Sequence, residues 1–232
     1  MTFIYPLVVA VACAVFGAGT WMQYAERHHL HQLFWTISLA MGFLGSLGYV
    51  LALSGGSMFW FRVYYLFGAM LMAPFLGLGS VYLHTHGTNR VASTTLWIVI
   101  ALSIVGTVFL FLSPGDAAAL AQLDGGPGTD VLSLSTVALV TLIVLNTFGL
   151  VAVAGLALDS AWELYRQRTS NRFFVGNLLL AVGTILVGAA GSLARLGAPT
   201  LFWALMAVGF VVLYAGFQVL NAASSAAQSD GG

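Results

Sequence analysis

The sequence predicts an all-α, polytopic membrane protein with seven transmembrane helices, and three observations support this prediction. The 232 residues are 60% hydrophobic and 6% charged, whereas an ordinary globular domain has about 25% charged residues. Seven apolar runs are long enough to cross a bilayer core of about 30 Å as helices. The runs are about twice as long as barrel strands and do not alternate apolar with polar residues, so helices are favoured over a membrane barrel.

The predicted spans follow one another through short connections and form one domain, residues 1–222. They lie near residues 3–23, 32–54, 59–84, 92–113, 131–158, 173–194 and 199–221. The first run has no positively charged segment before it, so we interpret it as a retained helix rather than a cleaved signal. Residues 223–232 are small and polar, and we expect them to form a short disordered cytoplasmic tail.

The third run, residues 59–84, carries Arg62 near its start, Pro74 near its middle and His84 at its end. Proline inside a helix removes a backbone hydrogen bond. We therefore expect a kink at Pro74 and the glycines that follow it.

Glycines also recur at helical spacing in the second and sixth spans. Such spacing lets helices approach closely, and tight packing is the predicted role. The residues are Gly42, Gly45 and Gly48 in the second span and Gly183, Gly188 and Gly191 in the sixth.

Two connections are long enough to carry structure of their own. In the fourth, PGDAAALAQL precedes the breaker DGGPG, and we expect a short interfacial helix there. The fifth reads DSAWELYRQRTSNR, with Glu163 three residues before Arg166 on one helical face. The fifth helix is therefore expected to continue into this connection.

The arginines predict the orientation, because positive residues favour the cytoplasmic side. The even-numbered connections lie beside two of them, Arg62 and Arg195. The odd-numbered connections carry Arg27, Arg90, Arg166, Arg168 and Arg172. We expect a protein of the cell membrane with its N-terminus outside and its C-terminus inside.

The composition also argues against several classes of protein. The net charge is zero, so the chain has no basic surface for nucleic acid. All seven basic residues are arginine, and a retinal Schiff base requires a lysine, so retinal is excluded. No Walker, HExxH or Gly-x-Ser-x-Gly motif occurs. An enzyme is therefore the less favoured interpretation.

The first candidate site is a ligand site between the third, fifth, sixth and seventh spans. It consists of Arg62, Tyr64, Tyr65, Asn146 and Arg195. An arginine in a span indicates function by default, although both arginines can also snorkel to the interface. Asn146 contacts the ligand in this hypothesis or hydrogen-bonds another helix. The hypothesis is a small-ligand binding, sensing or transport module in the lipid bilayer.

The second candidate site is a metal site at the inner face. His29, His31, His84 and His86 follow the first and third spans, and zinc binds three or four such ligands. They converge only if the third helix ends between His84 and His86; otherwise they are solvated interfacial histidines. This alternative is a membrane protein that binds a divalent metal, or a metal-dependent membrane enzyme. A third interpretation is a subunit that packs on another membrane protein.

Overall fold

The computed structural model describes residues 3–87, 89–167 and 171–229, and these residues confirm the all-α fold. Seven helical segments are long and apolar enough to cross a membrane, so the chain is a multi-pass membrane protein. The spans are α1 (Ile4–Arg27), α2 (Leu30–Gly55), α3–η1–α4 (Met58–His84), α5 (Arg90–Leu112), α7–η2–α8 (Thr136–Arg166), α9 (Asn171–Arg195) and α10 (Phe202–Ser229). The 3-10 turn η3 (Pro199–Leu201) precedes α10.

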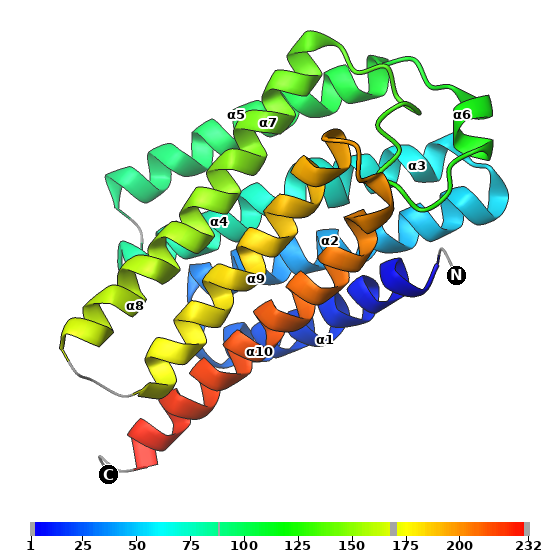
Figure 1. Cartoon of the computed structure of the whole chain (residues 1–232). Coiled ribbons are helices and arrows are strands. Elements are labelled where there is room, and N and C mark those ends of the chain that lie inside the picture. The colour runs from blue at the N-terminus through cyan, green and yellow to red at the C-terminus, as the bar shows by residue number, and fades with distance from the viewer. Residues whose placement is uncertain (1–2, 88, 168–170, 230–232) are drawn as a thin grey trace.

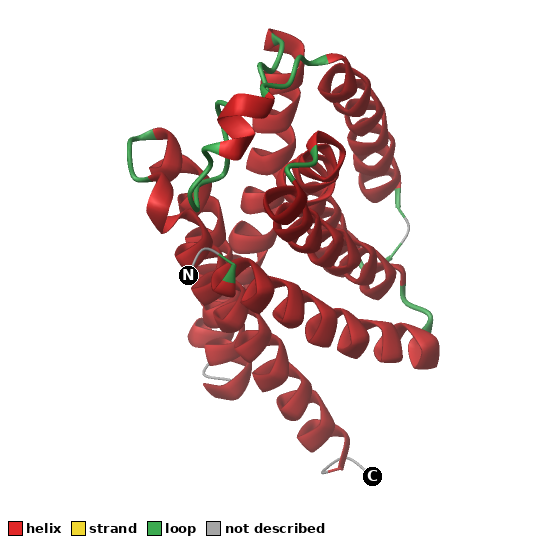
Figure 2. Cartoon of the chain, turned by 90° about the vertical axis from the view of Figure 1, so that its right-hand side faces the viewer, coloured by secondary structure: helices red, strands yellow, loops and turns green. Residues whose placement is uncertain are grey.

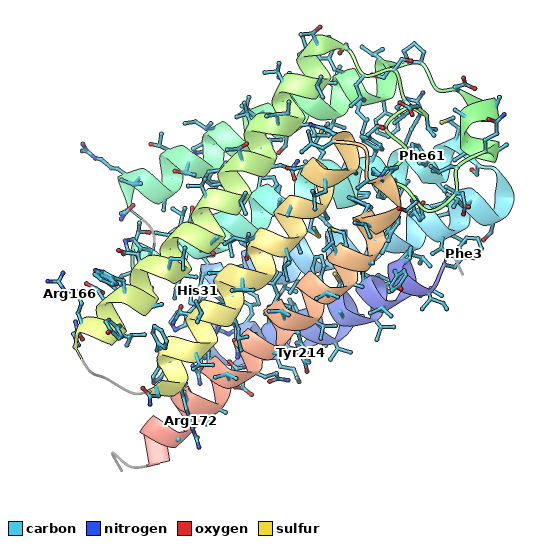
Figure 3. The ribbon with its side chains drawn as sticks, viewed as in Figure 1. Phe3, His31, Phe61, Arg166, Arg172 and Tyr214 are labelled. Carbon is cyan, nitrogen blue, oxygen red and sulfur yellow. The ribbon has the colours of Figure 1, made fainter. Side chains whose placement is uncertain are left out.

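The spans form a bundle with loops gathered at its two ends (Figures 1 and 2). The N-terminus lies at the same end as the short helix α6 (Ala117–Ala121), which we call the α6 end (Figure 1). Arg166 and Arg172 (Figure 3) and the C-terminus (Figure 1) lie at the opposite end, here the α8 end. The α1 helix packs on α2, α9 packs on α10, and α5 lies at the periphery.

Several bounds differ from the predicted ones by a few residues, and two of the differences have a local explanation. The fifth span begins at Thr136 rather than at 131, because the Ser135 hydroxyl caps this helix by accepting from the Ala138 N–H at 3.2 Å. Near the C-terminus of the chain, α10 continues to Ser229. Residues 223–229, predicted to be disordered, are therefore helical. Alanine, the best helix former, is frequent there. Residues 230–232, like Arg168, lie outside the described residues.

Both structured connections follow the predictions. Helix α6 forms inside PGDAAALAQL, where the Asp116 carboxylate caps its start by accepting from the N–H groups of Ala118 and Ala119 at 2.8 and 3.1 Å. The fifth span continues as α8 (Leu156–Arg166).

Two spans contain wide π-helical turns. In the third span, α3 (Met58–Tyr64) passes through η1 (Tyr65–Leu71) into α4 (Met72–His84). In the fifth, α7 (Thr136–Leu150) passes through η2 (Val151–Gly155) into α8. The irregularity predicted at Pro74 therefore begins earlier, at Tyr65, and ends at Leu71. Pro74 has no N–H to donate to a carbonyl in the preceding turns of the helix. This missing hydrogen bond accounts for the position of η1 just before Pro74.

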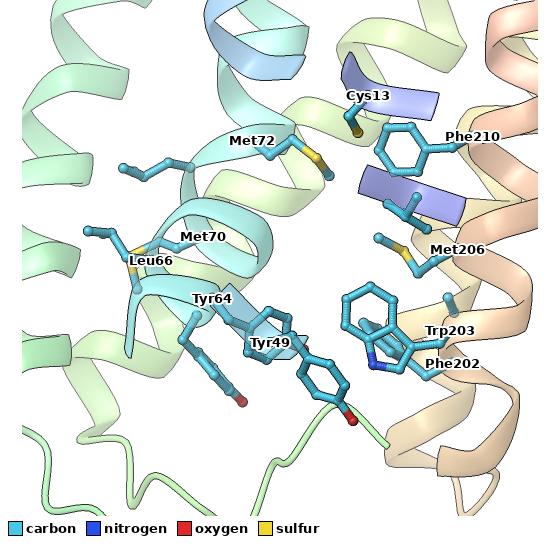
Figure 4. Packing of buried hydrophobic residues seen from close by; sticks show 14 of the residues in the cluster. Cys13, Tyr49, Tyr64, Leu66, Met70, Met72, Phe202, Trp203, Met206 and Phe210 are labelled. Atoms are coloured by element: carbon cyan, nitrogen blue, oxygen red, sulfur yellow. The ribbon is translucent and has the colours of Figure 1, made fainter. Parts of the chain in front are cut away.

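An aromatic core joins α2, α3 and α10 near the α6 end (Figure 4). The ring centroids of Tyr49 and Trp203 are 4.6 Å apart, and those of Tyr49 and Tyr64 are 5.0 Å apart. The Tyr49 hydroxyl donates to the Gly126 carbonyl at 2.7 Å, and the Tyr64 hydroxyl to the Pro127 carbonyl at 3.2 Å. The core thus holds the α6 connection against the bundle.

Candidate ligand-binding site

A cavity of about 490 Å³ lies between the third, fifth, sixth and seventh spans, in the half of the bundle nearer the α6 end. Four of the five predicted ligand residues line it: Tyr64, Tyr65, Asn146 and Arg195. Most of the remaining wall is apolar, and the volume lies in the range of about 300–1,000 Å³ that is usual for small-molecule sites.

The cavity exists because the fifth and sixth spans diverge. They pack together along α8 and α9, and a Cβ added at Gly188 would lie 3.1 Å from the Leu150 side chain. At Gly191, one turn nearer the α6 end, an added Cβ meets no atom within 4 Å. The lining residues Ile143 and Thr147 on α7 are exposed at the surface of the bundle. The cavity therefore opens sideways between α7 and α9, toward the lipid.

The end of the cavity farther from α6 is closed by a tight helix crossing. A Cβ added at Gly77 would lie 3.0 Å from the Gly149 Cα, and one at Gly149 would lie 2.4 Å from the Ala73 carbonyl oxygen. Only small residues allow two helix backbones to approach so closely. The third and fifth spans thus meet directly below the cavity floor.

Asn146 connects these two spans at the cavity wall. Its Nδ2 donates to the Ala69 carbonyl at 2.8 Å and to the Leu142 carbonyl of its own helix at 2.9 Å. In a π turn the donor for the Ala69 carbonyl is residue 74, which is proline and has no N–H. The Asn146 amide supplies a donor there. Its Oδ1 has no hydrogen-bond partner among the described residues, so this oxygen is free for a ligand.

Tyr65 and Arg195 form the charged and polar end of the cavity. Tyr65 is buried, and its hydroxyl makes no hydrogen bond within the part of the chain that the structure describes. Arg195, the last residue of α9, interacts electrostatically with this hydroxyl, as does Asp130. Arg195 is the one charged residue among the described residues that line the cavity, and it forms no ion pair with any of them.

Arg62, the fifth predicted residue, does not line the cavity. Its guanidinium donates to three carbonyls at the C-terminal end of α5, those of Leu110 at 3.0 Å, Phe111 at 2.8 Å and Ser113 at 2.8 Å. It also lies 6.0 Å from the centre of the Phe111 ring. A cation stabilises the negative end of a helix dipole, so Arg62 caps the end of α5.

The histidines do not form a metal site among the described residues. The rings of His29 and His31 stack with their centroids 5.5 Å apart, and His31 also packs edge-on against Trp35. His84, the last residue of α4, and His86, which follows the helix, are both exposed. Across the described ranges 3–87, 89–167 and 171–229, no three His, Cys, Asp or Glu residues are placed to hold a metal. The structure does not bring the four histidines into one site.

Sequence reasoning missed Gly191, Thr147 and the two π turns as features of this cavity. Gly191 belongs to the glycine pattern that predicted close packing, yet it faces open space. Spacing alone does not reveal which member of such a pattern faces a helix and which a cavity. No signal in the sequence marked η2, whereas Pro74 marked the region of η1.

Comparison of the chain with protein-family models, with curated proteins and with solved structures finds no match.

Proposed function

We propose that this protein binds a small, mainly apolar ligand in the cavity between its third, fifth, sixth and seventh spans. One observation carries the proposal: Tyr65, Asn146 and Arg195, far apart in the chain, line a single cavity of about 490 Å³. Each of these residues also has a polar group with no hydrogen-bond or ion-pair partner among the described residues. A mostly apolar wall with a few converging polar groups is the usual composition of a small-molecule site.

The form of the cavity favours binding or sensing over passage. The Gly77–Gly149 crossing closes it below, and the sixth and seventh spans are packed tightly beyond it. A Cβ added at Gly183 would lie 2.7 Å from the Leu213 backbone nitrogen. A transport cycle would require these contacts to part. Sensing needs only that a ligand alter the packing around η1 and η2, and π turns are frequent at functional sites.

Filling the cavity tests the proposal. Gly191 lines the cavity, and a Cβ there meets no atom within 4 Å, so Gly191→Phe occupies the space without a backbone clash. The probe is a neutral alkyl diazirine, photoactivated with the protein in lipid nanodiscs, and labelled peptides are identified by mass spectrometry. We expect labels on the cavity walls of wild-type α7 and α9, and a several-fold loss of them in Gly191→Phe.

The matched control is Gly55→Phe, because a Cβ at Gly55 also meets nothing within 4 Å but Gly55 is outside the cavity. Labels on the exposed face of α5 serve as the lipid reference in every sample. Gly55→Phe should label like wild type. The proposal is wrong if wild-type cavity peptides are labelled no more than the α5 reference, or if Gly191→Phe leaves their labelling unchanged.

A further inference from the structure

We infer that the ligand is a single-chain amphiphile with an anionic head group, admitted sideways from the membrane leaflet at the α6 end. This inference rests on the proposed function and deepens it. The head group would lie between Arg195 and Tyr65, and the chain would extend toward Asn146 and the apolar floor.

Entry from the lipid follows from the position of the opening. Ile143 and Thr147 line the cavity, are exposed, and lie within the spanning helix α7 rather than in a loop. On the other side of the opening, Gly191 and Ser192 of α9 leave space where larger side chains would close it. At the end of the cavity, Pro127 of the α6 connection lies over the bundle, held by Tyr64. A molecule already dissolved in the bilayer therefore has a shorter route into the cavity than a molecule that enters from the water past Pro127.

The anionic head group follows from the charges. Arg195 is the single charged lining residue within the described ranges and has no ion-pair partner there. The Tyr65 hydroxyl, within electrostatic reach of Arg195, is a second donor and has no acceptor in the part of the chain that the structure describes. Asp130 also acts on this hydroxyl, but it does not line the cavity and its side chain is exposed. A carboxylate or phosphate between Arg195 and Tyr65 would satisfy both donors.

The single chain follows from size and polarity. Beyond Arg195 the walls are mainly apolar down to Met206, Phe210 and Val153. A cavity of about 490 Å³ holds one small molecule. A two-chain phospholipid would have to leave much of its apolar part outside. Burial of each methylene contributes about 0.8 kcal/mol, so the apolar wall would stabilise one enclosed alkyl chain.

The experiment compares two photoactivatable probes with the same diazirine-bearing chain, a long-chain fatty acid and the corresponding alcohol. Both are added to wild-type protein in nanodiscs at a pH where the carboxylate is ionised. We expect the acid to label the cavity peptides of α7 and α9 about tenfold more than the alcohol, the usual gain from a charge-assisted hydrogen bond, after correction by the α5 reference.

Three variants test whether Arg195 and Tyr65 cause the preference for the acid over the alcohol. Arg195→Gln should make the two probes equal, Arg195→Lys should keep most of the preference, and Tyr65→Phe should reduce it several-fold. The neutral alkyl diazirine has no head group, so it should still label the cavity peptides in all three variants if the cavity is intact.

The outcomes separate the two proposals. Equal labelling of the wild-type cavity by both probes overturns the anionic head group and leaves the proposed function standing. Absence of cavity labelling by either probe overturns the proposed function itself. In a further arm, nanodiscs are doped with phosphatidylglycerol: continued labelling by the acid supports a single-chain ligand, whereas full displacement overturns it in favour of a two-chain lipid.

Discussion

At the scale of single residues, Asn146 has the most consequential position. Its amide joins the third and fifth spans where Pro74 leaves the helix short of a donor. Asn146→Leu should lower the free energy of unfolding by about 1 kcal/mol, the usual size of an interhelical hydrogen bond in a membrane. Equilibrium unfolding in mixed micelles measures this change.

Asn177→Leu is the matched control for this substitution. Asn177 donates at 2.9 Å to the Phe173 carbonyl, which belongs to its own helix and also takes part in the helix ladder. Its loss should therefore change stability less than the loss of Asn146. Equal effects of the two substitutions would contradict the special role of the contact with Ala69.

The two arginines at the α6 end show how far a sequence can predict a site. Arg62 and Arg195 both lie near helix ends on the same side of the membrane, so the sequence predicted the same ligand-binding role for both. The structure separates them, because the end of α5 lies within reach of Arg62 whereas Arg195 faces the cavity. Which carbonyls a long side chain reaches depends on helix packing, and helix packing is not readable from hydropathy.

At the scale of elements, the helix contacts depend on glycines whose surroundings differ. A Cβ at Gly149 would lie 2.4 Å from the Ala73 carbonyl oxygen, whereas one at Gly191 meets nothing within 4 Å. Gly149→Ala should therefore push the third and fifth spans apart and cost about 1–3 kcal/mol. Gly191→Ala should not reduce stability, because alanine is the better helix former. Thermal unfolding of both variants checks the difference, and a loss of stability in Gly191→Ala would contradict the open cavity wall.

The existence of the seven spans was predictable, because lipid leaves the backbone no partners outside the segment and so requires continuous helices. Their ends were less predictable. Ser135 sets the start of α7 through one capping bond, and α10 continues past its apolar part because nothing in its alanine-rich end stops a helix. The π turn η1 lies where Pro74 of the third span and the Asn146 amide of the fifth span come together. A single helix read alone does not contain that combination.

At the scale of the whole molecule, the cavity results from one pair of spans, the fifth and sixth, that meet at one end and diverge at the other. The fifth and sixth spans are joined along α8 and α9, and their separation toward the α6 end makes the opening. The hypothesis drawn from the sequence named the same four spans that line this cavity. It did not indicate a lateral opening, which depends on the angle between helices.

The orientation of the bundle decides which leaflet the opening faces. Arg166 and Arg172 lie at the α8 end with the C-terminus (Figure 3), and the two arginines at the α6 end have local roles in capping α5 and lining the cavity. We therefore expect the α6 end outside and the α8 end in the cytoplasm. Asp124→Cys, exposed in the α6 connection, and Gln167→Cys, exposed after α8, test this expectation.

In intact cells a membrane-impermeant maleimide should label Asp124→Cys, and should label Gln167→Cys after permeabilisation only. The wild-type protein is the blank, because its one cysteine, Cys13, is fully buried. The reverse pattern would place the cavity opening in the cytoplasmic leaflet, and the amphiphile would then reach Arg195 from the inner side of the membrane. Labelling of both positions in intact cells would indicate leaky cells and is checked with a cytoplasmic marker protein.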